Sequence, residues 1–451
     1  MNARPYTINV DEETLRDMRE RLARTRWPDE IPGAGWDYGV SADYLKDLVE
    51  YWRTDFDWRV HEARLNELPN VQVTVDGLAL HVIHERGRGP DPLPLLITHG
   101  WPSSCYETVE LIGMLTDPER YGGDPADSFD VIVPSLPGYG FSQRPETGGM
   151  TATRIAGMLV RLMAELGYER FAAHAYDIGA SMLSLACVDF PDRIIAYHTT
   201  EPANAVPYLG PGSPPLTEAE QDYLDLQEKW YGEEGGYDHI QATRPQTLAY
   251  GLNDSPAGLA AWIIDKWYTW TAPPSGDLGH HFTPDQLLAN ATIYWATGTI
   301  NSANRLYYER DHHPRMREAD DRIGVPAGIT LTTQEIERAP REYLERIFTD
   351  IRYWCDLGQG GHFVMLEEPA LLAESLRAFF RAFRLYPECP ADHARPARRP
   401  NGSECRRGRT PRCGPTAGPD SRPPRPAAWP GGGGREFTPA EPSSWGKRCD
   451  Q

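Results

Sequence analysis

Short apolar runs that alternate with helical segments limit what this chain can fold into more than any other feature. The stretches LPLLITHG and FDVIVPSLPGYGFS each read as a strand that ends in a loop, and FAAHAY reads as a strand followed by a helix. Residues 151–167 show helical spacing of apolar side chains. Strands that alternate with helices form parallel βαβ units, and ligands of such sheets bind beyond the carboxyl ends of the strands. The sequence therefore predicts an α/β protein with a mainly parallel sheet.

The segments on either side of these units divide the chain further. Two amphipathic helices near the N-terminus read as an arm, a Val-rich hairpin turns at Asp76-Gly77, and a Trp- and Tyr-rich helical stretch interrupts the strands. The predicted parts are an N-terminal meander arm packing on core and cap (1–68), a first part of the core (69–205), a helical cap (206–315), a second part of the core (316–388) and a disordered Pro/Gly/Arg-rich tail (389–451).

Composition excludes several classes of protein. The net charge of −20 argues against nucleic-acid binding, and no run of eighteen apolar residues could cross a membrane. The N-terminus shows no apolar signal region, so we expect a cytoplasmic protein. Seven cysteines lie far apart without a CxxC pair, which fits reduced thiols. The segment 391–451 carries 12 Lys and Arg against 6 Asp and Glu and reads as disordered, or less readily as a basic interaction arm.

The stretch AHAYDIGA, residues 173–180, places an acid between a buried strand and a helix. Small residues surround Asp177, as the strained nucleophile turn of an α/β-hydrolase requires, although no G-x-S-x-G motif occurs in the chain. A carboxylate is already ionised near neutral pH and suits attack on a saturated carbon that bears a strained leaving group. The plainer alternative is that Asp177 only caps the helix.

Three further segments favour a catalytic role. HGWP follows a strand, and the backbone N–H groups of Trp101 and Ile178 would form an oxyanion hole. GQGGHF places His362 in a loop before the last helix, where an α/β-hydrolase keeps its general base. Glu335, after the strand GITLTT, is the predicted orienting acid, and Asp350 and Asp356 are its alternatives.

Together these residues resemble the epoxide hydrolases of the microsomal and juvenile-hormone type, over about residues 4–385. The matching pieces are TRWPD, YWRTDFDW, HGWP, the Asp elbow, LNDSPAGLAAWI, YWATGTI and GGHFVMLEEP, and their order and spacing are specific. The resemblance implies an α/β-hydrolase fold with a helical cap and an N-terminal arm. Mammalian relatives carry a membrane anchor before the arm, whereas here the arm begins almost at Met1, so we expect no membrane association.

The resemblance also implies a mechanism. Asp177 opens the oxirane to a covalent alkyl ester, and His362 with Glu335 activates the water that cleaves it. Two cap tyrosines donate to the epoxide oxygen: GGYDHIQ gives Tyr237, and NRLYYER gives Tyr307, with Tyr308 left open as the alternative. Tyr308 and Pro102 are also predicted to line the substrate site.

Neither a metal nor an organic cofactor is expected. The pairs His280-His281 and His312-His313 lack the spacing of metal ligands. The expected partners are a small-molecule epoxide and water, with a homodimer as a further possibility.

One departure from the family pattern bears on the substrate. The family usually has G-G-D-W-G at the elbow, whereas this chain has A-Y-D-I-G, so Ile178 replaces an indole beside the nucleophile. A hydrophobic or aromatic epoxide is expected, and detoxification, aromatic-hydrocarbon catabolism and secondary metabolism would all use these same residues. The alternatives are a haloalkane dehalogenase, which also uses an aspartyl ester, and a silent hydrolase scaffold that only binds a hydrophobic ligand.

Overall fold

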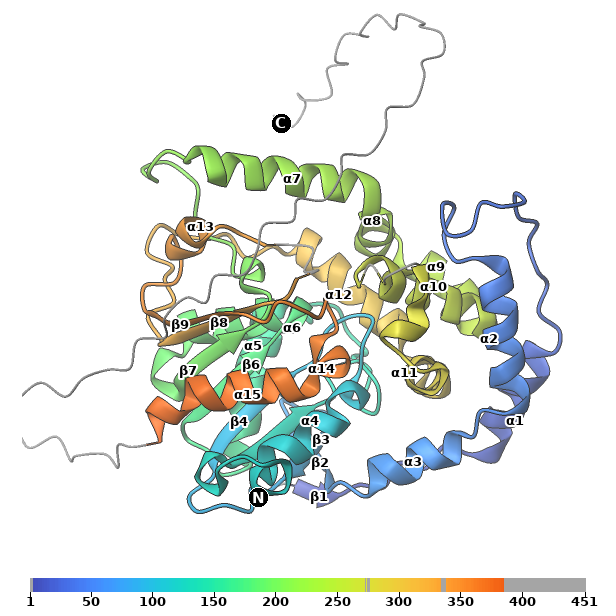
Figure 1. The fold of residues 1–451 in the computed structure, drawn as a ribbon, viewed down its shortest axis with the longest axis horizontal. Coiled ribbons are helices and arrows are strands. Elements are labelled where there is room, and N and C mark those ends of the chain that lie inside the picture. Colours follow the sequence, from blue (N-terminus) through green and yellow to red (C-terminus); the bar gives the residue numbers. More distant parts are fainter. Residues whose placement is uncertain (1–2, 272, 274–275, 334–337, 385–451) are drawn as a thin grey trace, which may run out of the picture. The chain divides into compact units, whose positions relative to one another are not determined.

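The computed structural model describes residues 3–271, 273, 276–333 and 338–384, and the predicted tail 389–451 lies outside these ranges (Figure 1). A nine-stranded sheet has the order β1-β2-β3-β5-β4-β6-β7-β8-β9. The strands are β1 (Ala3–Pro5), β2 (Asn70–Val75), β3 (Leu78–Glu85), β4 (Leu93–Thr98), β5 (Phe129–Pro134), β6 (Phe171–Ala175), β7 (Ile194–Thr199), β8 (Ala327–Leu331) and β9 (Ile351–Asp356).

The predicted α/β class with a mainly parallel sheet is confirmed. Strands β5, β4, β6, β7, β8 and β9 run parallel to one another, while β1, β2 and β3 form an antiparallel edge that pairs with β5. The predicted hairpin is β2 and β3, and Asp76 and Gly77 both have positive φ at its turn. Strands β4, β6 and β7 are neighbours, so the loops after them meet at one edge of the sheet.

Helices pack on the faces of the sheet. Helix α4 packs beside α15 and helix α5 beside α6, and all four bury apolar side chains against the sheet. The helices of the core are α4 (Val109–Thr116), α5 (Ala152–Glu165), α6 (Asp177–Asp189), α13 (Arg341–Glu345), α14 (Val364–Glu367) and α15 (Pro369–Phe380).

The predicted arm and cap are both helical, and the arm contacts the cap (Figure 1). The arm contains α1 (Glu12–Leu22), α2 (Ala42–Thr54) and α3 (Trp58–Asn66), and the cap contains α7 (Glu218–Glu234), α8 (Gly236–Thr243), α9 (Pro245–Asp254), α10 (Pro256–Thr269), α11 (Pro284–Thr297) and α12 (Ile300–His312). The buried indole N–H of Trp52 donates to Thr292 at 3.0 Å, and Arg21 pairs with Asp254 at 2.6 Å. Because β1 of the arm also pairs with β2, the arm holds the cap over the sheet.

Among the described residues, none of the helices has both the length and the apolar character needed to cross a membrane.

Several histidines are buried in the core. Burial lowers the pKa of His81 and of His174 to about 3, lowers that of His99 to about 4, and holds that of His198 well below its usual value. His174 and His198 contact each other through their Nδ1 atoms at 3.0 Å. These rings therefore remain neutral in the native state at mildly acidic pH.

Stability should fall as the pH drops below about 6.5, where an unfolded histidine begins to bind a proton that the native state does not accept. Burial raises the pKa of Glu107 to about 8, so protonation of this group stabilises the native state as the pH falls. Glu107 is a single group, however, and its effect is opposed by that of the four histidines. Urea unfolding at pH 7.5, 6 and 5 at constant ionic strength should give a progressively lower midpoint at constant slope. A midpoint that stays constant or rises toward pH 5 would contradict neutral burial of these rings.

Candidate active site

The turn between β6 and α6 has the strained backbone that the sequence predicts for a nucleophile. Asp177 is the first residue of α6 and has a φ of 51°, in the left-handed region that residues other than glycine rarely adopt. A Cβ atom at Gly179 would lie 2.6 Å from Thr98 Oγ1, and one at Gly100 would lie 2.3 Å from Asp177 Cβ. The turn can therefore approach the HGWP loop only because both positions are glycine.

The carboxylate of Asp177 is held by the HGWP loop and faces the predicted base. Its Oδ1 accepts a hydrogen bond from the backbone N–H of Trp101 at 2.8 Å, and its Oδ2 lies 3.3 Å from Nε2 of His362. Asp177 is 8% exposed and His362 is 2% exposed. The predicted nucleophile, base and first oxyanion donor thus come together in a site with little access for water. Ile178, the predicted source of the second donor, follows Asp177 in the first turn of α6, where backbone N–H groups have no partner within the helix.

Glu201 is the carboxylate that the structure places on the other nitrogen of His362. Its Oε1 lies 2.5 Å from Nδ1 of His362, and its Oε2 accepts hydrogen bonds from the backbone N–H of Asp177 and from Asn204 Nδ2, the latter at 2.8 Å. Glu201 is 3% exposed and follows β7, the neighbour of the elbow strand. Sequence reasoning missed it, although an acid just after a buried strand beside the elbow strand was a usable signal.

Of the three carboxylates predicted for this role, Asp350 and Asp356 lie in the described part of the chain, and neither contacts His362 there. Glu335 lies outside the described residues. Asp350 pairs with Arg352 and Asp356 pairs with Arg338 at the surface. In the described part of the chain, His362 therefore contacts Glu201 and neither of the two alternatives.

Aromatic rings fix the imidazole of His362 from three sides. The ring centres of Trp270, Phe363 and Tyr176 lie 4.8, 4.8 and 5.3 Å from that of His362, each in an edge-to-face arrangement. Such packing leaves the ring a single orientation, with one nitrogen toward Asp177 and the other toward Glu201. The apolar surroundings also strengthen the electrostatic contacts between these three groups.

The two predicted tyrosines meet opposite the nucleophile. Tyr237 of α8 stacks on Trp101 with ring centres 5.1 Å apart, and Tyr307 of α12 packs edge-on against the same indole at 5.8 Å. Both line a cavity of about 50 Å³ together with Asp177 and His362. Burial, followed by the charges of nearby Tyr237 and Asp177, raises the pKa of Tyr307 well above its usual value, so this phenol keeps its proton.

The remaining two predicted residues do not line that cavity. Tyr308 stacks on His312 with ring centres 3.7 Å apart, on another side of α12 from Tyr307. Pro102 is buried, and its carbonyl accepts a hydrogen bond from Asn290 at 2.7 Å. Of the adjacent pair, it is Tyr307 that faces Asp177.

An ion pair joins the two helices that carry the tyrosines. Arg310, three residues after Tyr307, donates to both oxygens of Asp238, the residue after Tyr237, at 2.8 and 2.7 Å. Burial alone would lower the pKa of Arg310, but the hydrogen bonds and charge of Asp238 outweigh it and raise that pKa. The guanidinium also lies 5.2 Å from the ring centre of Tyr307. The pair therefore sets the distance between the two phenols.

A buried acid lies behind the site. Glu107 accepts a hydrogen bond from the hydroxyl of Tyr176 at 2.6 Å, and that hydroxyl also contacts Ser103 at 2.9 Å. Because its pKa is raised to about 8 by burial, Glu107 is largely protonated near neutral pH. It therefore adds little negative charge next to Asp177 and His362.

Asp177, Glu201 and His362 form a group with one ligand atom each within 4.8 Å, which is close enough to hold a metal ion. The geometry is better suited to proton transfer. The imidazole stands between the carboxylates and turns a different nitrogen toward each of them, whereas metal binding needs one nitrogen and both carboxylates to converge on one point.

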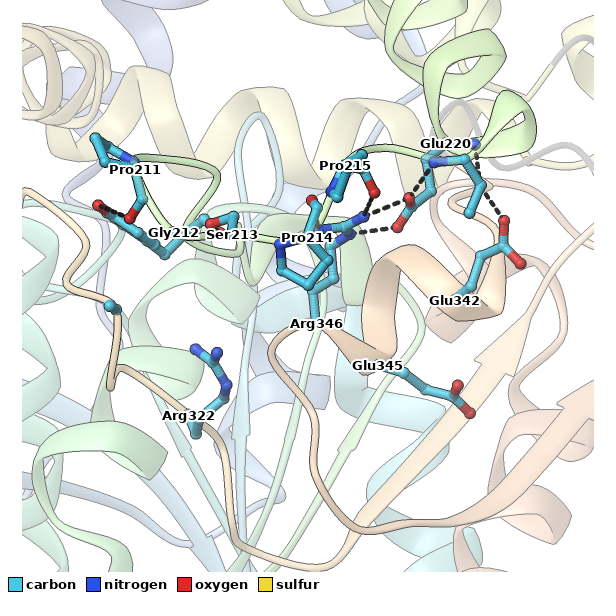
Figure 2. Close-up of a pocket in the computed structure, with 13 residues that line it drawn as sticks. Pro211, Gly212, Ser213, Pro214, Pro215, Glu220, Arg322, Glu342, Glu345 and Arg346 are labelled. Carbon is cyan, nitrogen blue, oxygen red and sulfur yellow. Dashed lines mark hydrogen bonds and ion pairs between the residues drawn. The ribbon is translucent and has the colours of Figure 1, made fainter.

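A larger cavity of about 510 Å³ lies away from this group, between residues 208–220 on one side and residues 319–322 and 342–346 on the other (Figure 2). Arg346 crosses it and donates to Glu220 at 2.7 Å and to the carbonyls of Pro214 and Pro215. This arginine fastens the start of the cap to the core, and none of the predicted site residues lines the cavity.

Comparison with known proteins agrees with this geometry. The pattern of the family described as "Epoxide hydrolase N terminus" matches residues 3–108, and that of the "alpha/beta hydrolase fold" matches residues 94–246. "Epoxide hydrolase 1" of Sus scrofa is 32% identical over 399 residues, which cover 83% of this chain and 88% of that protein. The chain belongs to the epoxide hydrolases.

Two further relatives support the same family. "Juvenile hormone epoxide hydrolase 2" of Ctenocephalides felis is 33% identical over 401 residues, covering 84% of this chain and 86% of that protein. The crystal structure of juvenile hormone epoxide hydrolase from the silkworm Bombyx mori superposes with a TM-score of 0.76 at 30% identity, covering 85% of this chain and 95% of that one. The predicted family and the α/β-hydrolase fold are therefore confirmed, and the protein is an epoxide hydrolase.

Proposed function

We propose that this epoxide hydrolase works in two steps through a covalent ester on Asp177. In the first step a carboxylate oxygen of Asp177 bonds to an oxirane carbon, the C–O bond of the ring breaks, and its electron pair goes to the departing oxygen. The observation that carries the proposal is the cavity in which the carboxylate of Asp177, the imidazole of His362 and two phenols face one another. A carboxylate at a strained turn is ready to attack without first losing a proton.

Tyr237 and Tyr307 supply the proton that the departing oxygen needs. An alkoxide is a poor leaving group in an apolar pocket, and a hydrogen bond from a neutral phenol stabilises the charge as it develops. The raised pKa of Tyr307 keeps its proton available for donation at neutral pH. Arg310 and Asp238 act as positioning residues, because their ion pair joins the two helices that carry the phenols.

The second step is hydrolysis of the ester. His362 takes a proton from water, hydroxide attacks the ester carbonyl, and the backbone N–H groups of Trp101 and Ile178 stabilise the negative oxygen. Collapse of the intermediate breaks the ester C–O bond, and the departing diol oxygen takes the proton that His362 holds. The proton of the added hydroxyl passes to the phenolate, so that the carboxylate, the imidazole and both phenols are restored. Glu201 orients His362 and stabilises the imidazolium that forms, as the acid of a hydrolase triad does. Glu335 remains a proposed second acid for this role.

Five aromatic side chains line the cavity beside Asp177 and favour a hydrophobic or aromatic epoxide. Trp230, Tyr231 and Trp270 line the cavity together with the two phenols. A haloalkane would gain no comparable benefit from paired phenol donors, because its departing halide needs no proton.

Replacing His362 with Gln should trap the ester. With styrene oxide as the substrate, intact-protein mass spectrometry is expected to show the mass rise by one epoxide molecule, and peptide mapping should place the adduct on Asp177. The control is Asp177→Asn in the same background, which should show no adduct. An unmodified protein after exposure to substrate, or an adduct on another residue, would refute the proposal.

Glu201→Gln should slow hydrolysis of the ester by about 100-fold or more while changing its formation much less, because orientation of the base matters only in the second step. Glu335→Gln is the matched control, and it should have a much smaller effect on that rate. Rapid-quench single-turnover kinetics separates the two steps. If Glu335→Gln stalls hydrolysis and Glu201→Gln does not, Glu201 only holds the turn through the N–H of Asp177.

A further inference from the structure

The cavity at the nucleophile is too small to hold most epoxides. Its volume is about 50 Å³, whereas pockets for organic ligands usually span roughly 300–1,000 Å³. The oxirane ring has to lie between Asp177 and the phenols of Tyr237 and Tyr307. Any sizeable substituent on the ring must therefore extend into another space.

A second cavity of about 310 Å³, which we name the side chamber, lies directly beside it. Four residues line both the side chamber and the cavity at the nucleophile: Ile178, Asn204, Tyr307 and Arg310. These side chains are the partition between the two spaces. Ile178, which directly follows the nucleophile, is the aliphatic member of that partition.

One face of α6 supplies an apolar wall to the side chamber. Ile178, Met182 and Leu185 follow at the i, i+4, i+7 spacing that places residues on one helical face. Leu185 lies about 10 Å along the helix from Ile178, at roughly 1.5 Å of rise per residue. Leu306 of α12 and Val206 also contribute to the apolar lining.

The far end of the side chamber is open to solvent. Val206 is 51% exposed, and the neighbouring Pro314 is exposed as well. Arg315 at this end is already bound to Asp189, with Nη1 at 2.5 Å from Oδ2. The chamber therefore runs from the partition at Ile178, along an apolar wall, to an exposed outer end.

We propose that the side chamber binds the substituent of the epoxide, and that Ile178 at its inner end and Val206 at its outer end determine how long an apolar chain it accepts. The favoured substrate class is a terminal epoxide that carries an extended alkyl chain. This inference rests on the proposed function, since it assumes that the oxirane lies against Asp177. Each methylene placed in an apolar pocket strengthens binding, so selectivity rises with chain length.

The test compares 1,2-epoxybutane, 1,2-epoxyoctane and 1,2-epoxydodecane by kcat/KM. Wild-type protein should favour the longer chains. Ile178→Trp places a larger side chain between the two cavities. It is expected to lower the ratio of kcat/KM for 1,2-epoxyoctane to kcat/KM for 1,2-epoxybutane by about tenfold or more. Val206→Trp narrows the outer end of the side chamber. It should lower kcat/KM for 1,2-epoxydodecane relative to 1,2-epoxyoctane, while kcat/KM for 1,2-epoxyoctane relative to 1,2-epoxybutane stays close to the wild-type value.

Leu226→Trp is the matched control, because Leu226 is 60% exposed on α7 and lines neither space. It should leave both ratios unchanged. Because Val206 is half exposed, its replacement should also fold, which the melting temperature checks. The wild type must first hydrolyse all three epoxides. If both ratios of kcat/KM are then unchanged in folded Ile178→Trp and Val206→Trp, the side chamber does not bind the substituent, and only this inference is refuted. Failure to trap an ester in His362→Gln would instead refute the proposed function.

Discussion

The contact between the carboxylate of Asp177 and the backbone N–H of Trp101 is the constraint on which the rest of the site depends. It requires a left-handed backbone at Asp177, at a cost of about 1–3 kcal/mol, and it requires glycine at positions 100 and 179, where any Cβ would collide. Packing of β4, β6 and α6 offsets this strain. The result is a carboxylate that is fixed before substrate arrives, with a backbone donor already beside one of its oxygens.

A basic group lies between two acidic groups at this site. His362 stands between Asp177 and Glu201, and its pairing with both lets two buried acids lie close together. Glu107, a third buried acid, largely avoids adding charge by keeping its proton. The phenols of Tyr237 and Tyr307 line the cavity opposite these groups. The arm holds the cap that carries them, through contacts such as that of Trp52 with Thr292. Stability of the arm and chemistry at the sheet edge are therefore coupled.

Sequence reasoning found the residues that local pattern specifies. The elbow at Asp177 and the loop of His362 follow from strand–turn–helix punctuation. The sequence left the choice between Tyr307 and Tyr308 open, because it depends on how α12 is rotated against the core. Glu201 was missed because its importance arises from the adjacency of β6 and β7, a long-range pairing that no local motif records. The side chamber was equally hidden, since it forms only where α6 packs against α12 and the segment after β7.

The most direct test of the covalent account is a single turnover in heavy-oxygen water with enzyme in excess over the epoxide. If Asp177 bonds to the oxirane carbon, the oxygen added to the first diol comes from the protein, so that diol should be unlabelled while label appears in the carboxylate of Asp177. Label in the diol from the first turnover, with none in Asp177, would show direct attack by water and contradict the role assigned to this carboxylate.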